Sequence, residues 1–100
     1  MKYEVSLTKS ALDDMAYFRL DEQRLIRAGI ISHLTTEAET ATRRKKPLRP
    51  NLISPWELRL DKFRVFYSIE ADENARAVKV VAVGHKEHND LFIRGEKVQL

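Results

Sequence analysis

The sequence predicts an α+β fold in two layers, in which an N-terminal helical hairpin packs on a mainly antiparallel sheet in the order β-α-α-β-β-β. Three observations lead to this prediction: an alternating segment at residues 2–8, two helical patterns before residue 42, and three strand-like segments within residues 56–83. The 100 residues, 43% of them hydrophobic, suffice for one core. We therefore expect a single domain over residues 1–100.

The N-terminal part predicts one strand and two helices. Residues 2–8, KYEVSLT, alternate in polarity, as is typical of a half-buried strand. Thr8 or Ser10 can cap the first helix, and Asp21 can cap the second. The apolar stripe expected for the first helix comprises Leu12, Met15, Ala16 and Leu20. The stripe expected for the second helix comprises Ile26, Ile30, His33, Leu34, Ala38 and Ala41.

A basic run follows the predicted second helix. Residues 43–49, RRKKPLR, hold five cations and no acidic residue, whereas the whole chain carries a net charge of only +3. Charge this local favours a polyanionic partner, although cations at the end of a helix also suit its C-terminal dipole, and both interpretations stay open. Residues 47–55 hold all three prolines and are expected to run as an extended connector into the strands.

Three strands are expected at residues 56–61, 63–70 and 76–83, with a turn at residues 71–74. The last of them, RAVKVVAV, is almost continuously apolar, and we expect it to be buried on both faces. The first two are separated by so few residues that they predict a tight hairpin.

A turn centred between Asp61 and Lys62 places Arg59 opposite Arg64 in that hairpin. The face expected to join the core comprises Trp56, Leu58, Leu60, Phe63, Val65 and Tyr67, and the other face comprises Glu57, Arg59, Arg64 and Phe66. Like charges directly opposite each other destabilise a pair of strands. An anion beside the two arginines would offset this repulsion. Glu57 could supply that anion internally, and a phosphate, which guanidinium groups chelate, is the alternative.

The C-terminal segment concentrates polar and aromatic candidates at His85, Lys86, His88 and Phe92. Lys86 and His88 follow a central strand, so we expect them to approach the arginine pair. The His-x-x-His spacing is only a weak indication of a metal site when no cysteine accompanies it, and no metal is expected. Phe92 suits either the core or a platform on which bases stack. Residues 93–100 suit either an edge strand or a free tail.

The chain has no cysteine and no long apolar run at its N-terminus. The sequence therefore predicts neither a disulfide framework nor a signal peptide or membrane span. We expect a soluble cytoplasmic protein with no membrane partner, no cofactor and no small-molecule ligand.

The order of elements and two motifs resemble the RelE/ParE superfamily of bacterial toxins from type II toxin-antitoxin systems. The motifs are WELRLDKFRVFY, residues 56–67, and VVAVGHKEHNDLF, residues 80–92. The resemblance implies a toxin that a cognate antitoxin protein neutralises. For RelE-like members it also implies a metal-independent endoribonuclease (an mRNA interferase) that cuts mRNA in the ribosomal A site and thereby inhibits translation.

The resemblance also implies roles for single residues. Arg64 matches the arginine that binds the scissile phosphate in this family. Arg59 and Glu57 fall where RelE has two catalytic lysines, so the glutamate reverses the charge at its position. Lys86 falls where RelE has an arginine, and Phe92 replaces the C-terminal tyrosine of RelE.

The segment HNDLF, residues 88–92, resembles the ending of the YafQ branch, in which that histidine is the general acid and the phenylalanine helps to place the RNA. Cleavage by the adjacent 2′-hydroxyl needs a base, cations around the phosphorane and an acid for the leaving 5′-oxygen. His88 is the acid candidate because histidine titrates near neutrality, and Glu57 or His85 is the base candidate. The expected phosphate contacts are Arg59, Arg64 and Lys86, and the expected contacts to messenger and ribosomal RNA are Arg43, Arg44, Lys45, Lys46, Arg49 and His85.

Two other functions stay open. A ParE-like chain would inhibit DNA gyrase by binding alone, and a catalytically degenerate module would only bind its antitoxin. Glu57 in place of a lysine favours these two alternatives, whereas His88 together with Phe92 favours the nuclease.

Overall fold

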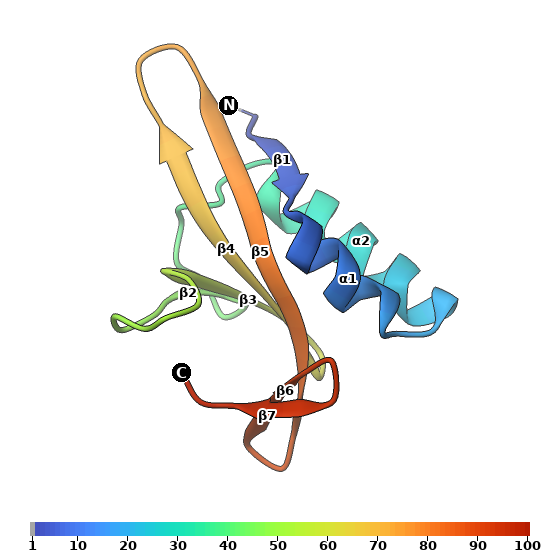
Figure 1. Ribbon diagram of the computed structural model, residues 1–100. Coiled ribbons are helices and arrows are strands. Elements are labelled where there is room, and N and C mark those ends of the chain that lie inside the picture. Colours follow the sequence, from blue (N-terminus) through green and yellow to red (C-terminus); the bar gives the residue numbers. More distant parts are fainter. Residues whose placement is uncertain (1) are drawn as a thin grey trace.

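The computed structural model of the protein describes residues 2–100 and has two helices on one face of a seven-stranded sheet (Figure 1). The elements are β1 (Glu4–Leu7), α1 (Lys9–Ala16), α2 (Leu20–Leu34), β2 (Lys45–Pro47), β3 (Trp56–Leu60), β4 (Phe63–Ala71), β5 (Arg76–Glu87), β6 (Asp90–Ile93) and β7 (Glu96–Val98). The predicted α+β fold with an N-terminal helical hairpin is confirmed. Within residues 2–100, no helix is long and apolar enough to cross a membrane.

The sheet is built around the long strand β5. Its order is β2-β3-β4-β5-β6-β7 with antiparallel neighbours, and β1 joins β5 in parallel. The register of β1 runs from Glu4 opposite Ala77 to Leu7 opposite Val80, while β6 pairs with β5 from His85 onward. Between the part of β5 that pairs with β1 and the part that pairs with β6, the edge of β5 faces helix α1. The backbone groups of β5 along this part of the edge need hydrogen-bond partners from the segment of α1.

Two apolar clusters lie on opposite faces of the sheet. The larger one joins the helices to the sheet, and its largest fully buried members are Met15, Ile26, Leu34, Leu58, Val65, Tyr67, Val78, Val80 and Val83. The smaller one is covered by the 48–55 loop and the C-terminal strands, and it comprises Phe66, Ala82 and Leu91 with Leu48, Ile53, Val81, Ile93 and Val98 against it. The expected burial of residues 76–83 on both faces pointed to the second cluster, but the loop and short strands that cover it carry no periodic pattern.

The first helix is shorter than predicted. Thr8 caps α1, with its Oγ1 accepting a hydrogen bond from the backbone N–H of Ala11 at 3.1 Å. The helix ends at Ala16, and Leu20 already belongs to α2 and is exposed. The buried residues of α1 are Ala11, Asp14 and Met15, so the predicted stripe was wrong at Leu12, Ala16 and Leu20.

The second helix begins at Leu20, with Arg19 in place of Asp21 at the N-cap position. The backbone N–H of Arg19 donates to the Glu22 carboxylate at 3.1 Å. The helix ends at Leu34, so Ala38 and Ala41 were wrongly predicted as helical. Ala38 is nevertheless fully buried, and its carbonyl accepts the Tyr67 hydroxyl at 2.9 Å, which is a tertiary contact that no helical period shows.

The C-terminal third has more strand than predicted. β5 continues four residues past the expected end at residue 83, and β6 and β7 fold back from it. The turn between β5 and β6 holds His88 and Asn89 with φ of 57° and 100°, as two-residue hairpin turns require. The tail therefore adds an edge strand, β7.

Candidate nucleic-acid interface

The hairpin of β3 and β4 has the predicted register. Arg59 pairs with Arg64, and Glu57 pairs with Phe66. The six residues expected on the core face all contact the larger cluster, with Trp56 half-buried at its edge. Glu57, Arg59 and Arg64 therefore share the face of the sheet that the helices do not cover.

Glu57 lies between the two arginines. Its Oε2 is 3.2 Å from Nε of Arg59, and its Oε1 is 4.0 Å from Nε of Arg64. The Glu57 side chain is only 3% exposed. A buried carboxylate needs compensating positive charge, and this one has two guanidinium groups. The cluster of Glu57, Arg59 and Arg64, called here the carboxylate-arginine cluster, carries one net positive charge.

The two arginines differ in how much of each meets solvent. The Arg59 side chain is 43% exposed and that of Arg64 only 13%. A terminal N–H group of Arg64 (Nη1) donates to the carbonyls of Asp61 at 2.6 Å and Phe63 at 2.9 Å, which fixes the guanidinium against the turn. Burial lowers the pKa of Arg64 and the charge of Arg59 adds to this, while Glu57 opposes it. Arg59 is thus the accessible cation and Arg64 the one held beneath it.

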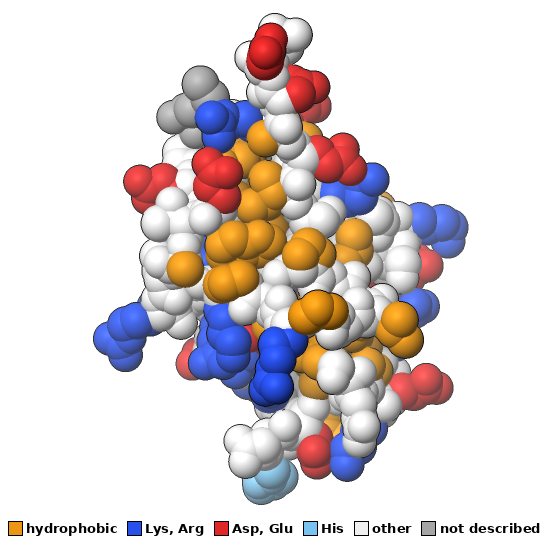
Figure 2. All heavy atoms as spheres, turned by 90° about the vertical axis from the view of Figure 1, so that its left-hand side faces the viewer, with side chains coloured by type: hydrophobic (Ala, Val, Ile, Leu, Met, Phe, Trp, Pro, Cys, Tyr) orange, Lys and Arg blue, Asp and Glu red, His pale blue; other side chains and the backbone are white. Residues whose placement is uncertain are grey.

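Further cations join the same face. The carbonyl of Arg44 accepts the backbone N–H of Arg59 at 2.7 Å, and Lys46 lies opposite Glu57 on β2. Lys86 is two residues beyond Gly84, the partner of Arg64 on β5, so alternation puts its side chain on this face. Viewed from the side away from the helices, Lys and Arg side chains gather below an apolar centre, with carboxylates at the top (Figure 2).

The structure separates the predicted basic run. Lys45 is buried, with Nζ 2.8 Å from the Glu37 carbonyl and 3.4 Å from the His33 carbonyl, so it neutralises the C-terminal end of α2. This geometry matches the helix-dipole interpretation for Lys45, and its contact with RNA stays a prediction. The other members of the run, Arg43, Arg44, Lys46 and Arg49, are exposed.

His85 and Phe92 lie on the other face of the sheet. The His85 ring stacks on Phe92 at 5.5 Å between ring centroids and faces Tyr17 at 6.3 Å. Its Nε2 is 3.3 Å from the Glu87 carboxylate, and its Nδ1 is buried without a hydrogen-bond partner in the described chain. The ring is mostly buried on the helix side of the sheet, and its expected contact with RNA stays a prediction. Phe92 is not brought together with Arg64, because it shares the face of His85.

His88 occupies the exposed tip of the turn between β5 and β6. It lies four residues beyond Gly84, which corresponds to about 13 Å along a strand. Lys86 lies midway between Gly84 and His88. Arg64 on β4 is thus opposite the part of β5 that leads through Lys86 to His88, but the structure shows no hydrogen bond or ion pair between His88 and the arginine pair among the described residues. Residues 2–100 contain no group of three or more His, Asp or Glu side chains that could hold a metal ion.

One polar contact was missed by sequence reasoning. Asp14 is fully buried; its Oδ2 accepts the backbone N–H of Val83 at 3.0 Å, and its Oδ1 is 2.8 Å from Nε of Arg94. Val83 lies between the part of β5 that pairs with β1 and the part that pairs with β6, so Asp14 completes that edge. Burial raises the pKa of Asp14, although Val83 and Arg94 oppose it. One feature of the sequence indicates that Asp14 is buried: it lies between Ala11 and Met15, the other buried residues of α1.

Comparisons with known proteins bear on the fold. No protein-family model matches the sequence, and no curated protein matches it. A chain in the crystal structure of the toxin-antitoxin complex RelBE2 from Mycobacterium tuberculosis has a similar structure, with a TM-score of 0.66 and 22% sequence identity. The match covers 86% of this chain and 100% of that chain. The fold expected from the resemblance is thereby confirmed.

Proposed function

We propose that the protein is the toxin of a toxin-antitoxin pair, and that it cleaves mRNA on the ribosome through attack of a 2′-hydroxyl on the adjacent phosphate. The fold it shares with a chain of a toxin-antitoxin complex supports the first part. The carboxylate-arginine cluster, on the face of the sheet away from the helices, is the observation that carries the second. A cognate antitoxin, mRNA and ribosomal RNA are the proposed partners, and the cytoplasm is the proposed location.

The carboxylate-arginine cluster suits a phosphate because its positive charge exceeds its negative charge. Arg59 offers its exposed guanidinium to the phosphate oxygens, and Arg64 keeps a positive charge beneath it. Lys86 extends this charge toward the turn. Cations fixed before the substrate arrives stabilise the pentacoordinate phosphorane without having to reorganise. Arg43, Arg44, Lys46 and Arg49 then contact the RNA backbone beyond the site.

Glu57 is proposed as a positioning residue instead of the base. Its carboxylate is buried and already lies against two guanidinium groups, so it is a poor acceptor for a proton from solvent-exposed ribose. His85, the other base candidate, has its Nδ1 buried and its Nε2 beside Glu87. Neither side chain is therefore assigned the proton of the attacking 2′-hydroxyl, which passes to water at the site as the O–P bond forms. Phe92 supports the His85 ring by stacking and is assigned no contact with the reacting phosphate.

His88 is the proposed general acid. It is the exposed histidine at the tip of the β5–β6 turn, and Lys86 bridges the distance between it and the arginine pair. A leaving 5′-oxygen bound between Lys86 and His88 would take its proton from the imidazolium. General acids of this kind contribute about 10²- to 10⁴-fold in rate.

The test is to add the purified protein to a translation extract and map the ends of the mRNA. We expect cuts confined to ribosome-occupied positions. The test variant is His88→Asn, because asparagine tolerates the positive φ of this turn and removes the acid. We expect it to lower cleavage about 100-fold or more. Intact mRNA, together with inhibited DNA supercoiling by gyrase, would instead support the ParE-like alternative.

A further inference from the structure

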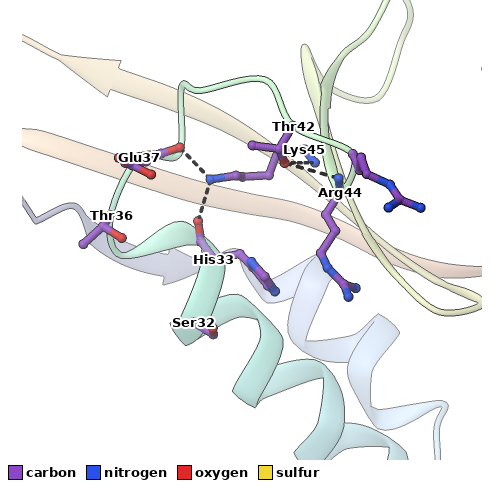
Figure 3. A pocket seen from close by; sticks show the side chains of 8 residues that line it. Ser32, His33, Thr36, Glu37, Thr42, Arg44 and Lys45 are labelled. Carbon is purple, nitrogen blue, oxygen red and sulfur yellow. Dashed lines mark hydrogen bonds between the residues drawn. The ribbon is translucent and has the colours of Figure 1, made fainter.

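Two hollows on the surface share a wall. The first, about 410 Å³, lies at the C-terminal end of α2 and is lined by Ser32, His33, Thr36, Glu37, Thr42 and residues 43–45 (Figure 3). The second, about 370 Å³, is lined by Arg43, Arg44, Arg59 and Asp61. Arg43 and Arg44 line both, so these two arginines lie between the carboxylate-arginine cluster, to which Arg59 belongs, and the end of α2. The first hollow is called here the α2 hollow.

The end of a helix is ordinarily a poor place for an anion, because its free carbonyl groups carry partial negative charge. Here Lys45 removes that obstacle. Its ammonium group lies between the carbonyls of His33 and Glu37, as the dashed lines in Figure 3 show. The ammonium group of Lys45 thus neutralises the C-terminal end of α2 from inside the fold. The other basic side chains that line the α2 hollow are not needed for this.

A histidine and an arginine face the hollow from two elements. The His33 ring extends from α2 and the Arg44 guanidinium from the segment before β2, and both point to the same side in Figure 3. Among residues 2–100, the Arg44 side chain makes neither a hydrogen bond nor an ion pair. Burial lowers the pKa of His33, and the charges of Arg44 and Lys45 lower it further. The lining contains one carboxylate, that of Glu37, against the two guanidinium groups of Arg43 and Arg44.

We propose that the α2 hollow binds a phosphate of the RNA strand, next along the backbone from the phosphate held at Arg59. The identity of the strand rests on the proposed function. The lining favours a nucleic-acid backbone over an acidic peptide: beside the single carboxylate of Glu37 it offers hydroxyl, imidazole and guanidinium donors and, within the described residues, no aliphatic or aromatic hydrophobic side chain. Arg44 lies between the two sites and links them, so that one strand occupies both.

The experiment measures binding without cleavage, using the full chain and a short single-stranded 2′-O-methyl RNA, which lacks the attacking hydroxyl. We expect Arg44→Gln to weaken binding and to reduce the slope of log affinity against log salt by about 0.7, the contribution of one phosphate on a single strand. The matched control is Arg27→Gln, which removes the same charge from an exposed site on α2 outside both hollows and should leave the slope unchanged.

Titration of the His33 ring by NMR provides the second measurement, with the signal identified by its loss in His33→Gln. Binding of the 2′-O-methyl RNA should raise the pKa of His33, because a phosphate stabilises the imidazolium. An equal slope for Arg44→Gln and Arg27→Gln, an unchanged His33 titration, or a shift produced by inorganic phosphate but not by the RNA would each overturn the proposal. Binding that depends on Arg44 in a protein that cuts no mRNA would sustain the α2 hollow while rejecting the nuclease.

Discussion

Two buried carboxylates, Asp14 and Glu57, each lie beside arginine but in different settings. The Asp14 carboxylate accepts a backbone N–H from Val83 and faces a single arginine, Arg94, at 2.8 Å. The Glu57 carboxylate faces two arginines and, within residues 2–100, accepts no backbone hydrogen bond. One carboxylate thus closes a gap in the fold, while the other organises charged side chains.

The two sites differ in the net charge that is left once each carboxylate is paired with its arginines. Asp14 and Arg94 balance each other, and the carboxylate has the further task of completing the edge of β5. Around Glu57 one positive charge is left over, and it is carried by a guanidinium group that reaches solvent. A surplus charge on an exposed, positioned side chain is available to an anionic ligand, whereas a balanced pair with a backbone partner is not.

The largest expected effect comes from removing one arginine from each setting. Arg59→Gln should lower cleavage of ribosome-bound mRNA on the order of 100-fold, because it removes the exposed group that stabilises the phosphorane. Arg94→Gln should leave the cleavage rate unchanged. Rates are measured by primer extension on a single mRNA. Equal losses of cleavage in Arg59→Gln and Arg94→Gln would show that the arginine beside Glu57 has no special part in the reaction.

Glu57→Gln separates a counter-ion from a base. The free energy of unfolding, measured by urea denaturation, should fall by about 2 kcal/mol; this is less than for a fully buried pair because Arg59 reaches solvent. Cleavage should fall by no more than about tenfold, less than the loss of a general base causes. The dependence of the cleavage rate on pH should be the same in the variant and the wild type. A loss of cleavage as large as that of His88→Asn would make Glu57 the base.

Asp14→Leu tests the structural carboxylate. The variant leaves the backbone N–H of Val83 buried without a partner, and we expect a loss of about 2 kcal/mol in the free energy of unfolding. Asp14→Asn keeps an acceptor oxygen for Val83 and should lose less. Cleavage by the folded fraction should match the wild type in both. A selective loss of cleavage in either variant would contradict the contrast between the two carboxylates.

The smallest expected effect is a pH dependence. Burial raises the pKa of Asp14 above its ordinary value of 3.8, so the folded state holds more protons than the unfolded state between 3.8 and the raised pKa. The contribution of Asp14 to stability therefore falls as pH rises through that window and is constant below it. Urea denaturation across acidic pH should show this trend in the wild type and not in Asp14→Asn. Parallel curves for the two proteins would contradict it.

Much of the fold followed from periodicity in the sequence. The hairpin register was predicted residue by residue because a two-residue turn fixes which side chains oppose each other, and Arg59 opposite Arg64 is the result. The parts that were missed depend on contacts between distant segments. Asp14 is buried because β5 has an unpaired stretch beside α1, and Lys45 is buried because α2 ends at Leu34, ten residues before the strand that carries Lys45.

The candidate site was also predictable where it depends on the alternation of side chains along the strands. Glu57, Arg59, Arg64 and Lys86 share one face because strand alternation puts them there. The position of Phe92 on the opposite face follows from the β5–β6 turn, whose two residues with positive φ were not recognised in HNDLF. The α2 hollow could not have been predicted, since it forms only where the end of one helix meets the approach to β2.

The most direct test of the central claim is a crystal structure of the full chain bound to the 2′-O-methyl RNA. The account predicts one phosphate within hydrogen-bonding distance of the Arg59 guanidinium, with Glu57 still between the two arginines. It predicts the neighbouring phosphate in the α2 hollow beside His33 and Arg44. RNA phosphates bound elsewhere, with Arg59 left facing only Glu57 and water, would contradict it.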